Sequence, residues 1–236
     1  MLGKLSRFAS PEIEHLLKKL EADETTYDNE MRSLDREKLV LPVELSTTDG
    51  ELEVHAFSRN LSPGGTSLIT PQPFSHGENM NLVLNLHNLL SRHTAECCWS
   101  QRFGQAYWTS GWKFTGKKVD MDAVKEADGM IGWDSRVTER EKYAVPVIIH
   151  QKGQKPRVHS FTRNMSGDGA CLVASHEIPE KAFCMLEFVR SDGERCDIIA
   201  ECIWSKKYGK KHWMTGWQFP RLDRIAKFHE ACFDRS

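Results

Sequence analysis

The sequence predicts a mainly β protein made of two six-stranded antiparallel barrels in tandem, each followed by a helix, with a further helix at the N-terminus. Three observations predict this fold class. The chain contains two similar units, each unit holds six short apolar runs separated by Gly, Asn, Asp and Pro, and no long helical pattern interrupts a unit. Such a series favours a small closed barrel, because closing the sheet leaves no exposed edge strand.

The repeat extends through both units. Residues 54–62 (VHAFSRNLS) align with 158–166 (VHSFTRNMS) at an offset of 104, and residues 108–114 (WTSGWKF) align with 213–219 (WMTGWQF) at an offset of 105. A repeat of this length indicates two homologous domains joined by short connections. We therefore expect an N-terminal helix and linker at 1–30, a first domain at 31–118, a linker helix at 119–134, and a second domain with a C-terminal helix at 135–236.

The first expected element is a helix over residues 10–22. Ser10 can serve as its N-cap, and Pro11 occupies the first helical position, where the missing N–H has no intrahelical partner to lose. The apolar residues that follow recur at i, i+3, i+4 and i+7 and form one stripe: Ile13, Leu16, Leu17 and Leu20. A stripe of this kind must pack on another part of the protein.

The strands are expected where runs rich in Val, Leu and aromatic residues lie between turn formers. In the first unit these runs are 39–46, 51–59, 66–70, 80–86, 93–100 and 107–114. In the second unit they are 143–150, 157–163, 170–175, 183–189, 196–205 and 213–219. The order and number of runs are the same in both units, which predicts the same barrel twice.

A helix is expected after each barrel. Residues 119–127 are helix-like until Asp128 and Gly129 stop the pattern. After the second unit, residues at helical spacing indicate a terminal amphipathic helix: Leu222, Ile225, Ala226, His229 and Cys232. Each helix could plug the end of its own barrel or contact a partner, and plugging is the simpler interpretation.

The composition excludes several classes of protein. The formal net charge of the 236 residues is −1, so the chain has no overall attraction for nucleic acid or for an anionic membrane. No apolar run is long enough to span a membrane, and no signal-peptide pattern follows Met1. We expect a cytoplasmic protein without a membrane span.

The cysteines and the absence of catalytic motifs argue against an enzyme. The seven cysteines lie mostly in strand-like runs without metal-ligand spacing, so we expect free thiols and no metal site. The sequence contains no Walker loop, nucleophile elbow or HExxH motif. We expect no catalytic residues.

One set of polar residues recurs in both units at fixed spacing. In the first unit Arg32 and Arg36 form an RxxxR pair, and Asn60, Ser62 and Gly65 form an NxSxxG pattern. The second unit repeats every member 104 positions later: Arg136, Arg140, Asn164, Ser166 and Gly169. Either motif alone is most simply a solvated arginine pair or a hairpin turn. Their joint recurrence at one spacing favours a ligand site in each unit.

These residue types suit a cyclic dinucleotide of guanine. A guanidinium can fork onto a phosphate, bind guanine O6 and N7, or stack on a base. Asn and Ser can donate to and accept from a base edge, and Gly permits positive φ and close backbone approach. The two arginines of a flexible lead-in segment could therefore fold over a ligand that rests on the NxSxxG segment.

The arrangement resembles the PilZ family, in which RxxxR is followed by D/NxSxxG and later by a strand that ends in a G-x-x-F type sequence. That last element is GWKF at 111–114 and GWQF at 216–219. The resemblance covers about residues 31–116 and 135–221 and leaves the N-terminal helix unexplained. In this respect the chain is similar to a tandem PilZ protein.

The resemblance implies bacterial six-stranded barrels that bind cyclic di-GMP, as a ligand rather than a catalytic cofactor. It would assign the phosphate and guanine contacts to Arg32, Arg36, Arg136 and Arg140, and the guanine edge to Asn60, Ser62, Gly65, Asn164, Ser166 and Gly169. To these we add the residues that directly precede each Asn, namely Arg59 and Arg163. Met31 and Ser135 stand where a third arginine would precede each pair, which favours one ligand per domain.

Three functions follow as hypotheses. The first is a cyclic di-GMP receptor or adaptor that changes conformation and regulates a protein effector in motility, exopolysaccharide synthesis, pili or virulence, as the resemblance implies. The second is a nucleotide-independent interaction adaptor built on the same barrels, as a monomer or an oligomer. The third is a single-stranded nucleic-acid binder, which the near-zero net charge disfavours, so no DNA or RNA partner is expected.

Two other features have open interpretations. Four tryptophans alternate with smaller residues, which is typical of a barrel core and less often of a base-stacking surface: Trp108, Trp112, Trp213 and Trp217. Residues 206–211 (KKYGKK) form a basic hairpin tip that the first unit lacks. The tip is a solvated turn or a contact specific to the second domain.

Overall fold

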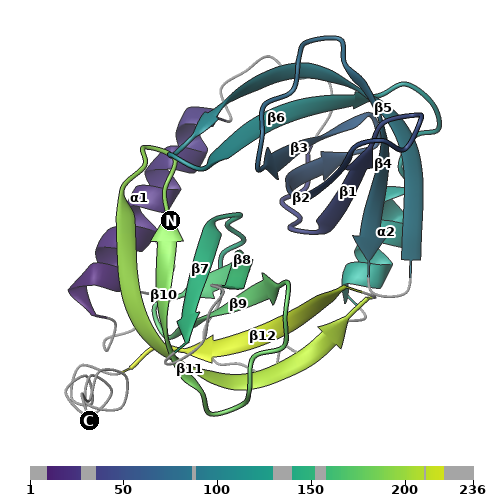
Figure 1. Ribbon diagram of the computed structural model, residues 1–236. Helices are drawn as coiled ribbons and strands as arrows, with labels where there is room; N and C mark the ends of the chain where they lie inside the picture. Colours follow the sequence, from purple (N-terminus) through teal and green to yellow (C-terminus); the bar gives the residue numbers. More distant parts are fainter. Residues whose placement is uncertain are drawn as a thin grey trace. The chain divides into compact units, whose positions relative to one another are not determined.

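The computed structural model describes residues 10–27, 36–86, 89–129, 140–151, 158–209 and 211–220, which form two closed β-barrels and two helices (Figure 1). The chain separates into two compact units, and each contains one barrel. The predicted fold class is confirmed for these residues. The C-terminal helix predicted from Leu222 to Cys232 lies outside them.

The first barrel has six strands, and every neighbouring pair is antiparallel. The strands follow the order β1-β2-β3-β6-β5-β4, and β4 pairs with β1 to close the sheet. Their bounds are β1 Pro42–Ser46, β2 Glu53–Ser62, β3 Gly65–Thr70, β4 Asn79–Leu86, β5 Leu89–Phe103 and β6 Tyr107–Phe114.

The second barrel repeats this topology in the order β10-β11-β12-β9-β8-β7, closed by pairing of β10 with β7. Its strands are β7 Pro146–Gln151, β8 Val158–Ser166, β9 Gly169–Ala174, β10 Phe183–Val189, β11 Arg195–Tyr208 and β12 His212–Gln218. The strands β5 and β11 are longer than predicted. Their hairpins with β6 and β12 stay paired as far as Phe103–Tyr107 and Tyr208–His212, through mostly polar residues that give no apolar run. Strand β5 also begins earlier than predicted, because Leu89 and Leu90 pair with the end of β4.

The barrel interiors are apolar. Alternate residues of β4 point inward and are almost fully buried: Met80, Leu82, Leu84 and Leu86. Trp112 and Trp217 belong to the two cores, and each indole N–H donates a hydrogen bond of 2.8 Å to the hydroxyl two residues earlier. The core interpretation of these two tryptophans is confirmed. Trp108 and Trp213 are only partly buried.

A tryptophan on each long hairpin lies against a glycine of the neighbouring strand. A Cβ added to Gly111 would lie 2.1 Å from Trp99 Nε1, and a Cβ added to Gly216 would lie 2.1 Å from Trp204 Nε1. The two indoles therefore occupy the space that a side chain at those positions would need. This explains physically why both copies have Gly in the GW motif.

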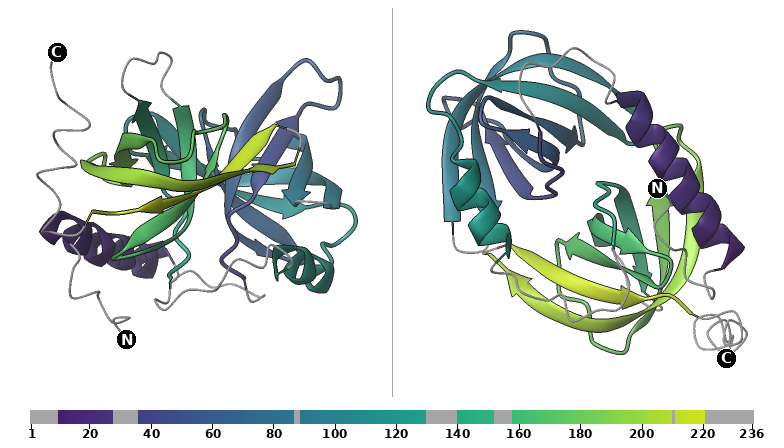
Figure 2. Two further views of the ribbon diagram at one scale, coloured as in Figure 1. Left: turned by 90° about the horizontal axis from the view of Figure 1, so that it is seen from below. Right: turned by 180° about the vertical axis from the view of Figure 1, so that it is seen from behind.

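The two helices cover different barrels. Helix α1 (Pro11–Tyr27) begins at Ser10, whose Oγ accepts a hydrogen bond from the amide of Ile13. Its buried residues Ile13, Leu16 and Leu20 join the core of the second barrel, and α1 lies alongside β11 (Figure 2). Helix α2 (Met121–Gly129) joins the core of the first barrel through Val124.

The apolar stripe of α1 thus packs on the second barrel. Helix α2 covers the barrel that directly precedes it in the chain, as the plugging interpretation expects. Helix α1 precedes the first barrel in the sequence but completes the core of the second. Among the described residues, no helix has the length and apolar character that crossing a membrane requires.

Candidate functional site

The NxSxxG segment spans a tight turn in both barrels: its Asn and Ser end one strand, two residues form the turn, and its Gly begins the next strand. β2 ends at Ser62 and β3 begins at Gly65, and β8 and β9 are joined in the same way at Ser166 and Gly169. Ser62 is 3% exposed, and its Oγ donates a 3.1 Å hydrogen bond to the carbonyl of Gly65. The two serines are thus buried in the turn, and Ser62 is bonded across it.

The glycine of the motif is required for close approach rather than for positive φ. Neither Gly65 nor Gly169 is among the glycines with positive φ. A Cβ would lie 2.3 Å from the carbonyl oxygen of Trp112 at Gly65, and 2.1 Å from that of Trp217 at Gly169. The sequence-based reason for these glycines is therefore only half right, because the neighbouring strand excludes a side chain while the backbone is unstrained.

A β-bulge precedes each turn and changes the direction of the side chains. The register of β2 against β3 shifts between Ser58 and Asn60, and the register of β8 against β9 shifts between Thr162 and Asn164. The extra residue is Arg59 in the first barrel and Arg163 in the second. Because a bulge breaks the alternation of a strand, the Arg and the following Asn are both only partly buried.

The lead-in segment is fixed on the barrel next to this bulge. Glu37 lies outside the strands, but it exchanges two backbone hydrogen bonds of 2.8 and 2.9 Å with Leu61 of β2. Glu141 and Met165 repeat the bridge with bonds of 2.9 and 2.8 Å. The residue that follows each RxxxR motif is thereby held beside the residue that follows the Asn of the NxSxxG motif in the same copy.

This bridge brings the two motifs into direct contact. Arg36 Nη1 donates a 3.1 Å hydrogen bond to Asn60 Oδ1, and Arg140 Nη1 donates one of 3.2 Å to Asn164 Oδ1. In the second barrel a Cβ at Gly169 would lie 3.2 Å from Arg140 Nη2, so the guanidinium also extends over the glycine. The structure places the second arginine of each pair against the NxSxxG turn. Arg32 and Arg136 lie outside the described residues.

Sequence reasoning missed the glutamate that anchors each lead-in. The motif reads Arg-Glu-Lys at 36–38 and again at 140–142, so an acidic residue follows the second arginine in both copies. That repetition was the available signal. It is weak by itself, because charged residues are common in exposed segments, and only the backbone bridges show that Glu37 and Glu141 hold a defined position.

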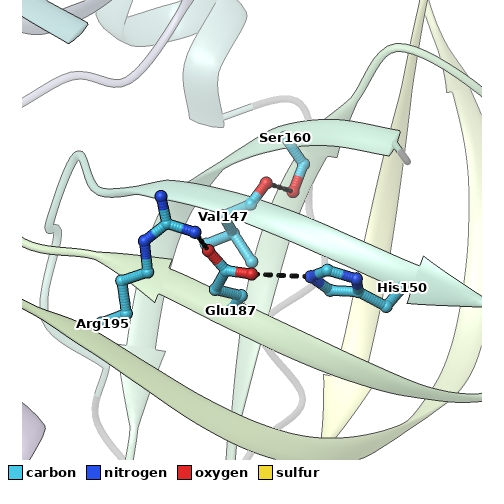
Figure 3. Close-up of polar contacts among 5 residues, drawn as sticks. All are labelled: Val147, His150, Ser160, Glu187 and Arg195. Carbon is cyan, nitrogen blue, oxygen red and sulfur yellow. Dashed lines mark hydrogen bonds and ion pairs between the residues drawn. The ribbon is translucent and has the colours of Figure 1, made fainter. Parts of the chain in front are cut away.

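The second barrel has a polar cluster that the first barrel lacks. Glu187 is 6% exposed and lies between two basic side chains (Figure 3). Its Oε2 is 2.8 Å from His150 Nε2, and its Oε1 accepts a hydrogen bond from Arg195 Nη1. The strand pairing of the two barrels places Ser46, Val83 and Leu90 at the equivalent positions of the first barrel. The cluster therefore belongs to one copy alone.

The thiols of the described strands are suited to packing rather than to chemistry. Burial raises the pKa of Cys97 to about 11, that of Cys196 to about 11 and that of Cys202 to about 12. These thiols stay protonated at neutral pH, and a protonated thiol is a poor nucleophile and metal ligand. All six described cysteines are free, as expected from their spacing.

The geometry gives each barrel one guanidinium and one side-chain amide that share a hydrogen bond beside a turn. A guanidinium has five donors, and guanidinium groups bind phosphates and guanine O6 and N7 through such donors. The arrangement occurs twice with bond lengths that differ by 0.1 Å. These residue types suit an anionic, base-containing ligand.

Comparison with known protein families gives a match over both barrels. The sequence model of the PilZ domain matches residues 30–126 and 134–233. No curated protein matches the chain in sequence.

Several solved structures resemble the chain. PlzA from Borreliella burgdorferi in complex with c-di-GMP has 13% sequence identity, with 92% of this chain and 100% of that chain covered and a TM-score of 0.32. YcgR from Escherichia coli in complex with c-di-GMP has 9% identity, coverage of 95% and 88%, and a TM-score of 0.33. The inhibitor of motility MotI/DgrA from Bacillus subtilis has 10% identity, coverage of 83% and 95%, and a TM-score of 0.31.

Proposed function

The chain belongs to the PilZ domain family, which matches both of its barrels, and from this premise we propose that it is a non-enzymatic receptor for cyclic di-GMP with one ligand site on each barrel. The observation that carries the proposal is the duplicated contact of Arg36 with Asn60 and of Arg140 with Asn164. Structural hydrogen bonds also recur between homologous barrels, as those of Trp112 and Trp217 do, but these lie in the core. The Arg–Asn contact is only partly buried and joins two motifs whose residue types suit a ligand, which favours a ligand site in each copy.

The residues of each site divide the work of binding. Arg36 and Arg140 supply donors to a phosphate or to guanine O6 and N7, while Arg32 and Arg136 add the second guanidinium of each pair. Asn60 and Asn164 orient the guanidinium and offer their amide to the base edge. Arg59 and Arg163 lie directly beside them on the bulge and complete the cationic side of the site.

The remaining motif residues shape the turn. Ser62 and Ser166 are buried in the turn, and Gly65 and Gly169 allow the neighbouring strand to approach. Their role is to hold the Asn and the backbone in position, and replacement would act through the geometry of the site. The arginines, by contrast, act through charge.

We further propose that the receptor works in the bacterial cytoplasm, where it passes the signal to a protein effector. A ligand changes a conformational equilibrium only if it binds one conformation more tightly than the other. Contacts made by Arg32 and Arg136 only when the ligand is bound would supply that difference. The effector then binds the favoured conformation.

Calorimetric titration with cyclic di-GMP tests the proposal. The intact protein is compared with the double variants Arg32→Ala/Arg36→Ala and Arg136→Ala/Arg140→Ala. We expect two sites in the intact protein and one in each double variant. Absence of binding heat at tens of micromolar ligand, with partner capture unchanged by nucleotide, would instead support the nucleotide-independent adaptor.

A further inference from the structure

Helix α2 contacts both halves of the binding motif of the first barrel. The amide of Val119, just before the helix, donates a 3.0 Å hydrogen bond to the carbonyl of Pro63 in the NxSxxG turn. Lys125 Nζ on the helix lies 2.6 Å from Glu37 Oε1 on the lead-in segment. Helix α2 and the residues that lead into it thus connect the turn after Asn60 with the segment that carries Arg36.

The helix is a fixed platform for these contacts. Val124 is 1% exposed in the core of the first barrel, next in sequence to Lys125. Asp120 caps the helix, with its Oδ1 accepting hydrogen bonds of 3.1 Å from the amides of Asp122 and Ala123. Since core packing and the cap hold the backbone of α2, the Lys125 side chain extends toward Glu37 from a fixed backbone position.

Lys125 affects the site in two ways. Its ammonium pairs with the Glu37 carboxylate and so reduces the negative charge on the lead-in segment that would repel an anionic ligand. It also restrains Glu37, whose backbone bridge with Leu61 fixes the distance between Arg36 and Asn60. The same ion pair raises the pKa of Lys125, first through its hydrogen bond to Glu37 and second through the opposite charge.

From these contacts we propose that Lys125 is a positioning residue of the first ligand site, holding the lead-in segment through Glu37 so that Arg36 faces Asn60. This inference rests on the proposed function, because it concerns the same ligand. It assigns α2 a role beyond covering the barrel. The helix is linked to occupancy of the first site, because movement of the lead-in on binding changes a contact that α2 makes.

The expected effect is modest. Lys125 and Glu37 are each about half exposed, with side-chain exposures of 51% and 50%, and exposed ion pairs contribute little in water. Loss of the pair should therefore weaken binding at the first site by about two- to fivefold, and less at high salt. Binding at the second site should not change, because Lys125 belongs to the unit of the first barrel and Arg140 and Asn164 to the unit of the second.

The test measures cyclic di-GMP affinity at the first site alone, in an Arg136→Ala/Arg140→Ala background. Lys125→Ala is compared with Lys118→Ala, which removes an exposed lysine just before the same helix. The charge-reversed pair Glu37→Lys/Lys125→Glu keeps the net charge, so it should restore an affinity that Lys125→Glu alone reduces. In protein without added nucleotide, Lys125→Ala should also speed hydrogen exchange of the Leu61 amide, which bonds to Glu37.

The outcomes are distinct. If the intact protein binds no cyclic di-GMP at either site, the proposed function and this inference both fail. If the intact protein binds but Lys125→Ala behaves like Lys118→Ala, or the reversed pair stays as weak as Lys125→Glu, only the role of Lys125 is overturned.

Discussion

Arg36 and Asn60 lie 24 residues apart in the sequence, and the guanidinium of the first donates a 3.1 Å hydrogen bond to the amide oxygen of the second. The contact joins two motifs that the sequence could only place at a constant spacing. Because Asn60 already orients the guanidinium, less side-chain freedom remains to be lost when a ligand binds. The proposed site is to that extent preorganised by the barrel itself.

Two replacements of Asn60 should show whether its side chain matters as the hydrogen-bond acceptor for Arg36 or only through its size. Asn60→Ala removes the oxygen that orients Arg36 and should weaken cyclic di-GMP binding at the first site by about tenfold, the scale of one hydrogen bond to a charged group. Asn60→Asp keeps that oxygen, so it should retain most of the affinity. Calorimetry on the Arg136→Ala/Arg140→Ala background measures both, with the exposed Asn79→Ala as control. Equal affinities for Asn60→Ala and Asn60→Asp would contradict the role of Asn60.

Trp99 and Gly111 supply a stability prediction for the first barrel. Gly111→Ala would place a Cβ 2.1 Å from Trp99 Nε1, so the indole must swing away. We expect a loss of about 1–3 kcal/mol in the free energy of unfolding, the usual range for overpacking. Thermal unfolding measures the loss. Gly116→Ala is the control, since its Cβ meets only the Thr94 hydroxyl at 3.1 Å, and a Gly111→Ala protein as stable as that control would refute the packing argument.

Helix α1 should stabilise the second barrel and leave the first unaffected. Leu16 is 1% exposed in the second core, so Leu16→Ala should lower the free energy of unfolding of that barrel by about 2–5 kcal/mol. Pulse alkylation in urea can follow each barrel separately through its own buried thiol, Cys97 in the first and Cys202 in the second. The urea concentration at which half of Cys202 is alkylated should fall, while the corresponding concentration for Cys97 should not change.

The matched control for α1 is Lys18→Ala, on the exposed side of the same helix. It should move neither midpoint, because Ala favours helix and no core contact is lost. A fall of the Cys97 midpoint in Leu16→Ala would show that α1 supports the first barrel instead.

The alkylation rate of Cys196 and its dependence on pH report on the packing of the same helix. It packs against the core that α1 joins, and burial raises its pKa to about 11. Only thiolate reacts readily, so between pH 7 and 9 alkylation of Cys196 should lag behind that of the exposed Cys98 and should keep rising toward pH 11. Leu16→Ala should speed the alkylation of Cys196, because greater exposure lowers the pKa of this thiol toward its ordinary value. Mass spectrometry of time points measures both rates, and equal rates in the intact protein would contradict the burial.

The Glu187 cluster predicts a contrast between breaking an ion pair and replacing it. Arg195→Leu alone leaves a buried carboxylate with one partner fewer and should cost about 1–3 kcal/mol. The triple change His150→Ser/Glu187→Val/Arg195→Leu copies the first barrel and should lie within about 1 kcal/mol of the intact protein, since apolar replacement of a whole buried pair is often neutral. Urea midpoints at Cys202 compare the two. A triple variant less stable than Arg195→Leu would overturn the prediction.

Much of the fold was predictable because local patterns and the repeat determine it. Strand β6 was predicted with its observed bounds, and β10 was as well, because alternating apolar residues and turn formers mark both ends. The long strands β5 and β11 were predicted too short, since backbone pairing extends their hairpins beyond the predicted runs, at the tips shared with β6 and β12 and, for β5, also at the hairpin with β4. The bulges at Arg59 and Arg163 could not be predicted either, because an extra residue in a strand changes the pairing register with the neighbouring strand without changing the composition.

The sequence by itself determined that there are two barrels, where each NxSxxG turn falls, and that α1 must bury the stripe from Ile13 to Leu20. It could not determine which barrel receives that stripe, because two homologous barrels offer similar apolar ends. Tertiary packing decided that α1 completes the second core and that Lys125 of α2 meets Glu37. It also decided that Arg36 faces Asn60, since contacts between distant residues depend on how the barrel closes and not on the spacing between them.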